Sequence, residues 1–143
     1  MNKYRRARVV AMQVLYGSEL NPNTELPMAM IRERVKNDLE QVDYACKLLR
    51  GVQQDQEAID ARISAVLQNW RFQRLAPVDR NILRIGTFEL LEATEPVAIV
   101  INEAIEIAKE YGDKNSGRFV NGVLDKVRIE LEKERSEEEN GAF

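Results

Sequence analysis

Apolar residues recur at helical spacing along almost the whole chain, and no stretch sustains the alternation typical of a half-buried strand. Four prolines, at positions 22, 27, 77 and 96, divide this pattern into blocks, because proline cannot continue a regular helix. The pattern therefore predicts an all-α fold whose helices are joined by short connections.

The pattern predicts six helices, over residues 4–20, 27–36, 42–70, 78–93, 100–111 and from 116 to about 132. We expect the third to be one rod of roughly 40 Å, with Gly51 on its outer side and Trp70 at the end of its apolar face. The helix over 78–93 is apolar nearly all round, which places it at the centre of the fold. We expect Tyr111 to face inward. The result is two layers of helices, joined by the long third helix.

The length of 143 residues suits one domain, which we place at residues 1–132. Residues 133–143 are highly charged, so we expect a disordered tail. Cys46 is the single cysteine and cannot form an intramolecular disulfide, which favours a reducing compartment. No apolar run is long enough to span a membrane, and the N-terminus lacks a signal-peptide core. We therefore expect a cytoplasmic protein.

The residue types argue against an enzyme. The chain has no histidine, the commonest general base and metal ligand, and Cys46 is best interpreted as an inert buried thiol. We expect no cofactor and no metal. The net charge of −3 does not by itself suggest nucleic-acid binding, so the distribution of the charges must decide.

Positive charges gather at the N-terminus, at Lys3, Arg5, Arg6 and Arg8. On a helix, Arg5, Arg8, Met12 and Tyr16 fall within roughly 80° of one another, away from the apolar stripe. We expect this face to meet solvent, where arginine binds phosphates and tyrosine stacks on an unpaired base. The alternative is an ordinary solvated helix end with a half-buried tyrosine.

A second candidate lies in the turn over residues 112–119, where Lys114, Arg118 and Phe119 surround the start of the last helix. Helix N-termini favour phosphate, and Phe119 lies at the edge of the apolar stripe. The spacing of Gly112 and Gly117 resembles a P-loop. However, Arg118 and Phe119 replace the required Lys and Ser or Thr, so we exclude nucleoside triphosphate binding. The alternative is a simple turn in which Phe119 closes the core.

Three glutamates align at helical spacing, at Glu103, Glu106 and Glu110. We interpret them mainly as a solvated outer face. The alternative is a surface for a partner protein, and Glu103 and Glu106 are its candidates.

Four blocks of sequence resemble the NusB family, in the order in which the family carries them. They are RRAR at 5–8 followed by AMQVLY at 11–16, PVDRNILRI at 77–85, INEAIEIAK at 101–109 and FVNGVLDK at 119–126. Val9 and Asn115 depart from residues that are often acidic in the family. The resemblance covers about residues 4 to 128.

The resemblance implies a NusB-like fold of about seven helices in two three-helix groups. It implies a transcription antitermination factor that binds the boxA element of ribosomal RNA leader transcripts together with NusE, a small-subunit ribosomal protein. This complex helps RNA polymerase resist termination. By the same resemblance, Arg5, Arg6, Arg8, Tyr16 and Phe119 are RNA-contact candidates, and Asp79 lies near the junction of RNA and NusE.

Two other functions remain as alternatives. One is a helical adaptor that binds proteins and touches no RNA itself. The other is the related domain that precedes some RNA cytosine methyltransferases; no methyltransferase domain follows here, so we expect no catalysis. The oligomeric state stays open, with a homodimer as one alternative.

Overall fold

The computed structural model describes residues 2–22, 25–69 and 71–141, and within them the chain is helical without strands. The helices are α1 (Arg5–Leu20), α2 (Met28–Arg34), α3 (Leu39–Gln54), α4 (Gln56–Val66), the short 3-10 helix η1 (Phe72–Arg74), α5 (Pro77–Glu92), α6 (Val97–Tyr111) and α7 (Ser116–Gly141). The all-α prediction is therefore confirmed. No helix in these ranges is both long and apolar enough to cross a membrane.

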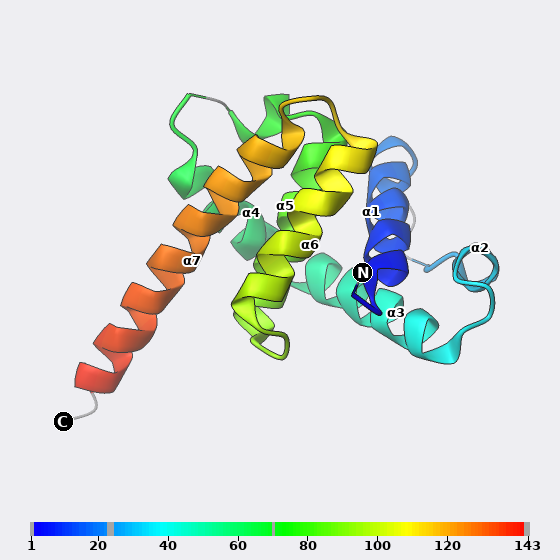
Figure 1. Ribbon diagram of the computed structural model, residues 1–143, viewed down its shortest axis with the longest axis horizontal. Helices are drawn as coiled ribbons and strands as arrows, with labels where there is room; N and C mark the ends of the chain where they lie inside the picture. The colour runs from blue at the N-terminus through cyan, green and yellow to red at the C-terminus, as the bar shows by residue number, and fades with distance from the viewer. Residues whose placement is uncertain (1, 23–24, 70, 142–143) are drawn as a thin grey trace.

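Helix α5 is the centre of the fold, as its apolar surface predicts. It begins with Pro77, whose missing N–H costs nothing in the first turn of a helix, and every residue from 81 to 90 is buried. It contacts α1 and α3 on one side and α6 and α7 on another (Figure 1). This arrangement leaves α1, α5, α6 and the start of α7 sharing one end of the molecule.

The long third helix of the prediction is two helices, and this expectation was wrong. Asp55 ends α3 and begins α4, with φ −113° and ψ 21° outside the helical range. Ile59 and Ile63 in α4 are as buried as the core-facing apolar residues of α3. The apolar spacing thus continues across the break and conceals it. Trp70, the expected end of this helix, lies outside the described residues.

Gly51 faces the core rather than the outer side of α3. A Cβ atom at this position would lie 2.1 Å from Cε1 of Phe88 on α5. Glycine therefore allows the closest approach of α3 and α5, and the expected outward position is corrected.

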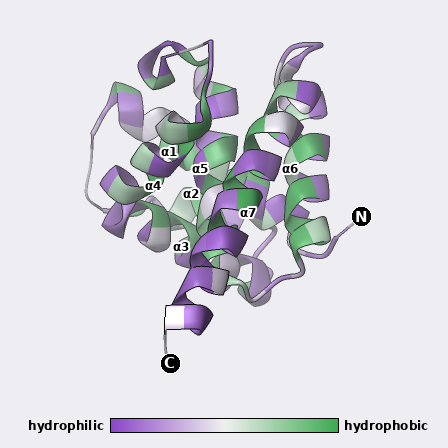
Figure 2. Cartoon of the chain, turned by 90° about the vertical axis from the view of Figure 1, so that its left-hand side faces the viewer, coloured by the Kyte–Doolittle hydropathy of each residue, from purple (hydrophilic) through white to green (hydrophobic). Residues whose placement is uncertain are grey.

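Helix α7 continues to Gly141, whereas the charge pattern predicts a disordered tail from residue 133. Figure 2 shows hydrophilic residues along this last part of the helix. Side-chain contacts join it to the body: Arg62 on α4 pairs with Glu134 at 3.0 Å, and Arg135 donates to the Leu90 carbonyl at 3.1 Å. These contacts between distant segments are invisible in a local charge pattern.

Candidate nucleic-acid interface

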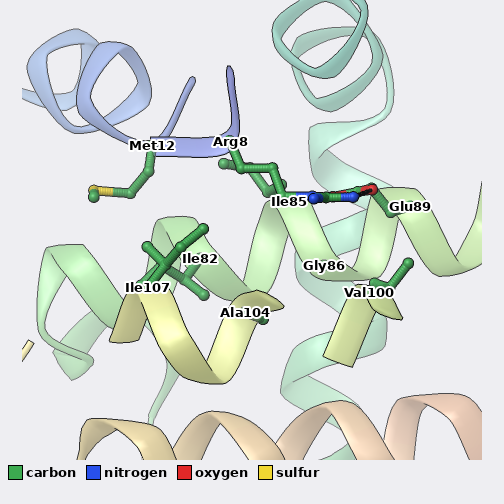
Figure 3. A pocket seen from close by; sticks show the side chains of 9 residues that line it. All are labelled: Arg8, Met12, Ile82, Ile85, Gly86, Glu89, Val100, Ala104 and Ile107. Carbon is green, nitrogen blue, oxygen red and sulfur yellow. Dashed lines mark hydrogen bonds and ion pairs between the residues drawn. The ribbon is translucent and has the colours of Figure 1, made fainter. Parts of the chain in front are cut away.

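Arg8 is not on the surface, contrary to the sequence analysis. Its side chain is 2% exposed and forms two parallel hydrogen bonds to Glu89 on α5, Nε to Oε1 at 2.8 Å and Nη2 to Oε2 at 2.9 Å. Figure 3 shows Arg8 reaching from α1 towards Glu89. Met12, expected on the same solvent face, is also buried, in a small internal space that it shares with Ile82 and Ile107. This face of α1 packs against α5 and α6.

Further groups complete the surroundings of the Arg8–Glu89 pair. The Tyr44 hydroxyl donates to Glu89 Oε2 at 2.6 Å, and Tyr44 stacks on Tyr4 with ring centroids 4.0 Å apart. Burial, reinforced by the neighbouring carboxylate, raises the pKa of Tyr44. Burial alone would lower the pKa of Arg8, but the hydrogen bonds and charge of Glu89 outweigh it and raise that pKa. Arg8 is thus a fixed positive charge inside the fold.

Arg5 and Glu103 form the next ion pair along the same seam. Arg5 Nε donates to Glu103 Oε1 at 3.0 Å, and Arg5 Nη2 donates to Oε2. Glu103 is 2% exposed and also lies 3.6 Å from Arg8, so it is neither a solvated residue nor an accessible partner contact. The prediction that Glu103 lies on a solvated outer face of its helix is therefore wrong. Glu106 does reach the surface, where it pairs with Lys109 at 3.5 Å.

The remaining N-terminal cations face solvent. Lys3 forms an exposed pair with Glu40 at 3.4 Å, and its ammonium lies 4.9 Å from the Tyr4 ring centroid. Arg6 is exposed, and among the described residues no hydrogen bond or ion pair holds its side chain. Of the four basic residues in the opening motif, Arg6 is therefore the one with its full charge available to a ligand.

Tyr16 is exposed, at 38%, as the sequence analysis expected. It lines a hollow of about 230 Å³ together with Met12 and Val78. Tyr111 from the end of α6 lines the same hollow and is 40% exposed, so the prediction that it faces inward was wrong. Tyr111 is the last residue of α6. Helical spacing alone places Tyr111 on the apolar stripe, so the sequence pattern does not reveal its exposure.

The turn between α6 and α7 has a fixed geometry. The Asp113 N–H donates to Ser116 Oγ at 2.9 Å, and the Asn115 N–H donates to Asp113 Oδ1 at 2.7 Å. A Cβ on Gly112 would lie 2.3 Å from Ser116 Oγ, so the turn closes too tightly for a larger residue. Lys114 and Arg118 project from this turn into solvent. Both are free of ion pairs within the part of the chain that the structure describes.

Phe119 and Asp79 lie together at a second hollow, of about 340 Å³, which Arg74 and Asn115 also line. Phe119 is half-buried, while Asp79 is 8% exposed. Asp79 Oδ1 has no hydrogen-bond partner among the described residues. Burial raises the pKa of Asp79, opposed by its interaction with the Ser116 side chain and reinforced by the charge of Asp113.

The structure thus brings together aromatic rings and free cations at the end of the molecule shared by α1, α5, α6 and α7. Tyr16 and Tyr111 are exposed and Phe119 is half-buried; the cations without an ion pair among the described residues there are Arg74, Lys114 and Arg118. Rings that stack on unpaired bases and cations that hold phosphates are what single-stranded nucleic acid requires. The described residues hold no cluster of His, Cys, Asp or Glu suited to a metal ion.

Solved structures of other proteins resemble this fold. The NusB protein of T. maritima has a solved structure with a TM-score of 0.80 and 38% identity, covering 90% of this chain and 92% of that one. A structure described as antitermination factors NusB and NusE in complex with dsRNA has a TM-score of 0.74 and 32% identity, over 90% of this chain and 98% of the matched chain.

Sequence comparison agrees with the structural likeness. The transcription antitermination protein NusB of Anaeromyxobacter dehalogenans (strain 2CP-1 / ATCC BAA-258) is 54% identical over 127 residues, or 85% of this chain and 87% of that protein. The protein of the same name from Bdellovibrio bacteriovorus is 43% identical over 86% of this chain and 93% of its own length. The sequence profile of the NusB family matches residues 5–128. Together with the helical architecture, these matches show that the chain belongs to the NusB family.

Proposed function

We propose that this chain is a transcription antitermination protein that binds boxA RNA together with NusE and so helps RNA polymerase resist termination at ribosomal RNA leaders. The observation that carries the proposal is the likeness to the NusB–NusE–dsRNA complex at 32% identity and a TM-score of 0.74. In this function the chain acts in the cytoplasm, next to RNA polymerase. As a member of a family of transcription antitermination proteins, it is not an enzyme.

The two hollows with their rings form the proposed RNA-binding surface. Tyr16 and Phe119 stack on unpaired bases, and Tyr111 joins them because it borders the same hollow as Tyr16. Arg6, Lys114 and Arg118 bind phosphates, with Lys3 at the edge of the surface. Arg6, Lys114 and Arg118 have no ion pair among the described residues, and Lys3 is held only in an exposed pair with Glu40.

Arg5 and Arg8 have a different role in the proposal. Their charges are matched inside the protein by Glu103 and Glu89, so they position α1 against α5 and α6 rather than bind phosphate directly. Asp79 and Glu106 remain the proposed contacts for the partner protein. Asp79 lies in the wall of the hollow beside Phe119, and Glu106 lies on the outer side of α6.

A titration with labelled boxA RNA tests the proposal. The purified chain is titrated with single-stranded boxA RNA and with a scrambled RNA of equal length, each with and without NusE. We expect selective binding to boxA, tightened by NusE through a coupling of roughly 1–3 kcal/mol, and the same coupling for NusE when RNA is added first. Binding to NusE with no contribution from RNA would instead identify the chain as a protein-binding adaptor.

A further inference from the structure

A groove of about 210 Å³ lies beyond the hollow of Phe119 and Asp79, between the segment after α4 and the first turns of α7. Six of the residues that line it carry the argument: Gln68, Asn69, Arg118, Phe119, Gly122 and Lys126. Phe119 borders both this groove and the hollow with Asp79. The groove therefore continues the proposed RNA-binding surface rather than standing apart from it.

Two positive charges mark the groove. Arg118 and Lys126 are eight residues apart on α7, which places them roughly 12 Å apart along one side of the helix. Both are exposed, and neither has an ion pair within the described ranges. Arg128, two residues further on, differs because Asp125 and Glu132 neutralise it at 2.7 and 3.0 Å. Arg118 and Lys126 are thus two positive charges of this helix that no carboxylate neutralises within the described ranges, and both line the groove.

The floor and the opposite wall also suit a nucleic-acid strand. A Cβ on Gly122 would meet no atom within 4 Å, so the space above this residue is open. The exposed side-chain amides of Gln68 and Asn69 stand on the opposite wall and offer both hydrogen-bond donors and acceptors. None of the described residues that line this groove carries a carboxylate, whereas Glu130 and Glu134 line the hollow between α4 and the later part of α7.

We propose that this groove binds the sugar-phosphate backbone of RNA nucleotides that flank boxA. The proposal rests on the proposed function, since it extends the same RNA strand past Phe119. Arg118 and Lys126 bind phosphates, the two amides contact sugar or base edges, and Gly122 leaves room for the strand. Because phosphates carry no sequence information, this contact adds affinity for longer RNA without adding base selectivity.

The test compares boxA RNA of minimal length with the same RNA extended by several uridines at either end. The full chain binds each RNA over a range of salt concentrations, in the presence of NusE. We expect one of the two extensions to tighten binding to the natural protein. For that extended RNA, Lys126→Gln should flatten the slope of log affinity against log salt by about 0.7, the value for one single-strand phosphate contact. Its slope and affinity with the minimal RNA should equal those of the natural protein.

Two further variants separate charge from space. Gly122→Leu keeps every charge but fills the groove, so it should also abolish the increase in affinity that the RNA extension gives. Lys133→Gln removes a lysine of the same helix outside the groove and should change the affinity for neither the minimal nor the extended RNA. Circular dichroism melting confirms that each variant is folded, which is expected because the space at Gly122 is open.

The outcomes distinguish the two proposals. If neither extension raises the affinity of the natural protein for RNA, the groove does not bind RNA. The same conclusion follows if Lys126→Gln and Gly122→Leu both bind the extended RNA as much more tightly than the minimal RNA as the natural protein does. If these variants weaken binding to NusE in the absence of RNA, the groove is a protein contact and the proposal is overturned. If the natural protein fails to bind minimal boxA RNA, the proposed function fails first, and the inference that rests on it falls as well.

Discussion

Arg8 on α1 and Glu89 on α5 form a buried ion pair with two parallel hydrogen bonds, at 2.8 and 2.9 Å. Both side chains are less than 5% exposed. Arg8 of the opening basic motif is therefore part of the core. This residue holds α1 in place, while other residues of the motif face solvent and are available to a ligand. A basic motif at a helix start can have both roles, and the burial of each residue separates them.

Removing one partner of this pair should destabilise the fold. Arg8→Met leaves the Glu89 carboxylate buried without its main counter-charge, and such a change costs about 3–5 kcal/mol. Denaturant unfolding measures the loss. Arg6→Met is the matched control, since Arg6 is exposed on the same helix, and its stability should stay within about 0.5 kcal/mol of the natural protein. Equal stability of the two variants would show that the buried pair contributes nothing.

The salt dependence of RNA binding should follow the free cations. If Arg6, Lys114 and Arg118 each bind one phosphate, their triple alanine variant should flatten the slope of log affinity against log salt by about 2, from about 0.7 per contact. Fluorescence anisotropy at several salt concentrations measures the slope. An unchanged slope in the triple variant would remove these three cations from the RNA-binding surface.

The geometry of α1 shows what the sequence could predict and what it could not. Helical spacing correctly places Arg5, Arg8, Met12 and Tyr16 along one side of the helix. It does not show that α1 is covered twice, by α3 on the side of Ala7 and by α5 and α6 on the side of Arg8 and Met12. A helix that packs against neighbours on two sides exposes only its remaining surface. Tyr16, near the end of α1, is on the part of the helix that these neighbours do not bury.

One signal in the sequence pointed to the buried pairs. Helix α5 was predicted to be buried nearly all round, yet Arg84 and Glu89 lie within it. A charged residue in a fully buried helix requires a partner of opposite charge. Arg84 finds Asp60 at 2.8 Å and Glu19 at 2.9 Å, and Glu89 finds Arg8. The need for partners was predictable, but their identity depends on which helices pack together.

Glu19 should make the free energy of unfolding depend on pH in the acidic range. Hydrogen bonds from Arg80 lower the pKa of Glu19, which joins the end of α1 to α5. A lowered folded-state pKa contributes stability above the unfolded-state pKa, and this contribution is lost as the pH falls through the folded-state value. Glu19→Gln should therefore be less stable than the natural protein at pH 7, and the gap should narrow below about pH 4.5.

Unfolding free energies at several pH values measure this gap. Glu33→Gln, an exposed glutamate of α2, is the control for the loss of one carboxylate. A gap for Glu19→Gln that stays constant down to pH 3 would contradict the role of the Arg80 contact.

Asp79 should have the opposite pH dependence. Burial raises its pKa, so its favourable contribution is complete below the unfolded-state pKa and is lost as the pH rises through the folded-state value. Asp79→Asn carries no charge at any pH. Its stability relative to the natural protein should therefore improve between about pH 4 and pH 7. The same substitution at exposed Asp43 is the control, and a relative stability of Asp79→Asn that falls with rising pH would be the contrary result.

Tyr16 provides the most direct test of base stacking. Its ring is 38% exposed beside the hollow it shares with Tyr111, so truncation should create little cavity. Stacking contributes about 1–3 kcal/mol per base, so Tyr16→Ala should weaken boxA binding roughly 5- to 150-fold. Tyr16→Phe keeps the ring and should bind nearly as well as the natural protein. Melting temperatures separate stacking from folding: a Tyr16→Ala protein that melts much earlier but binds RNA normally while folded would assign the ring to the core.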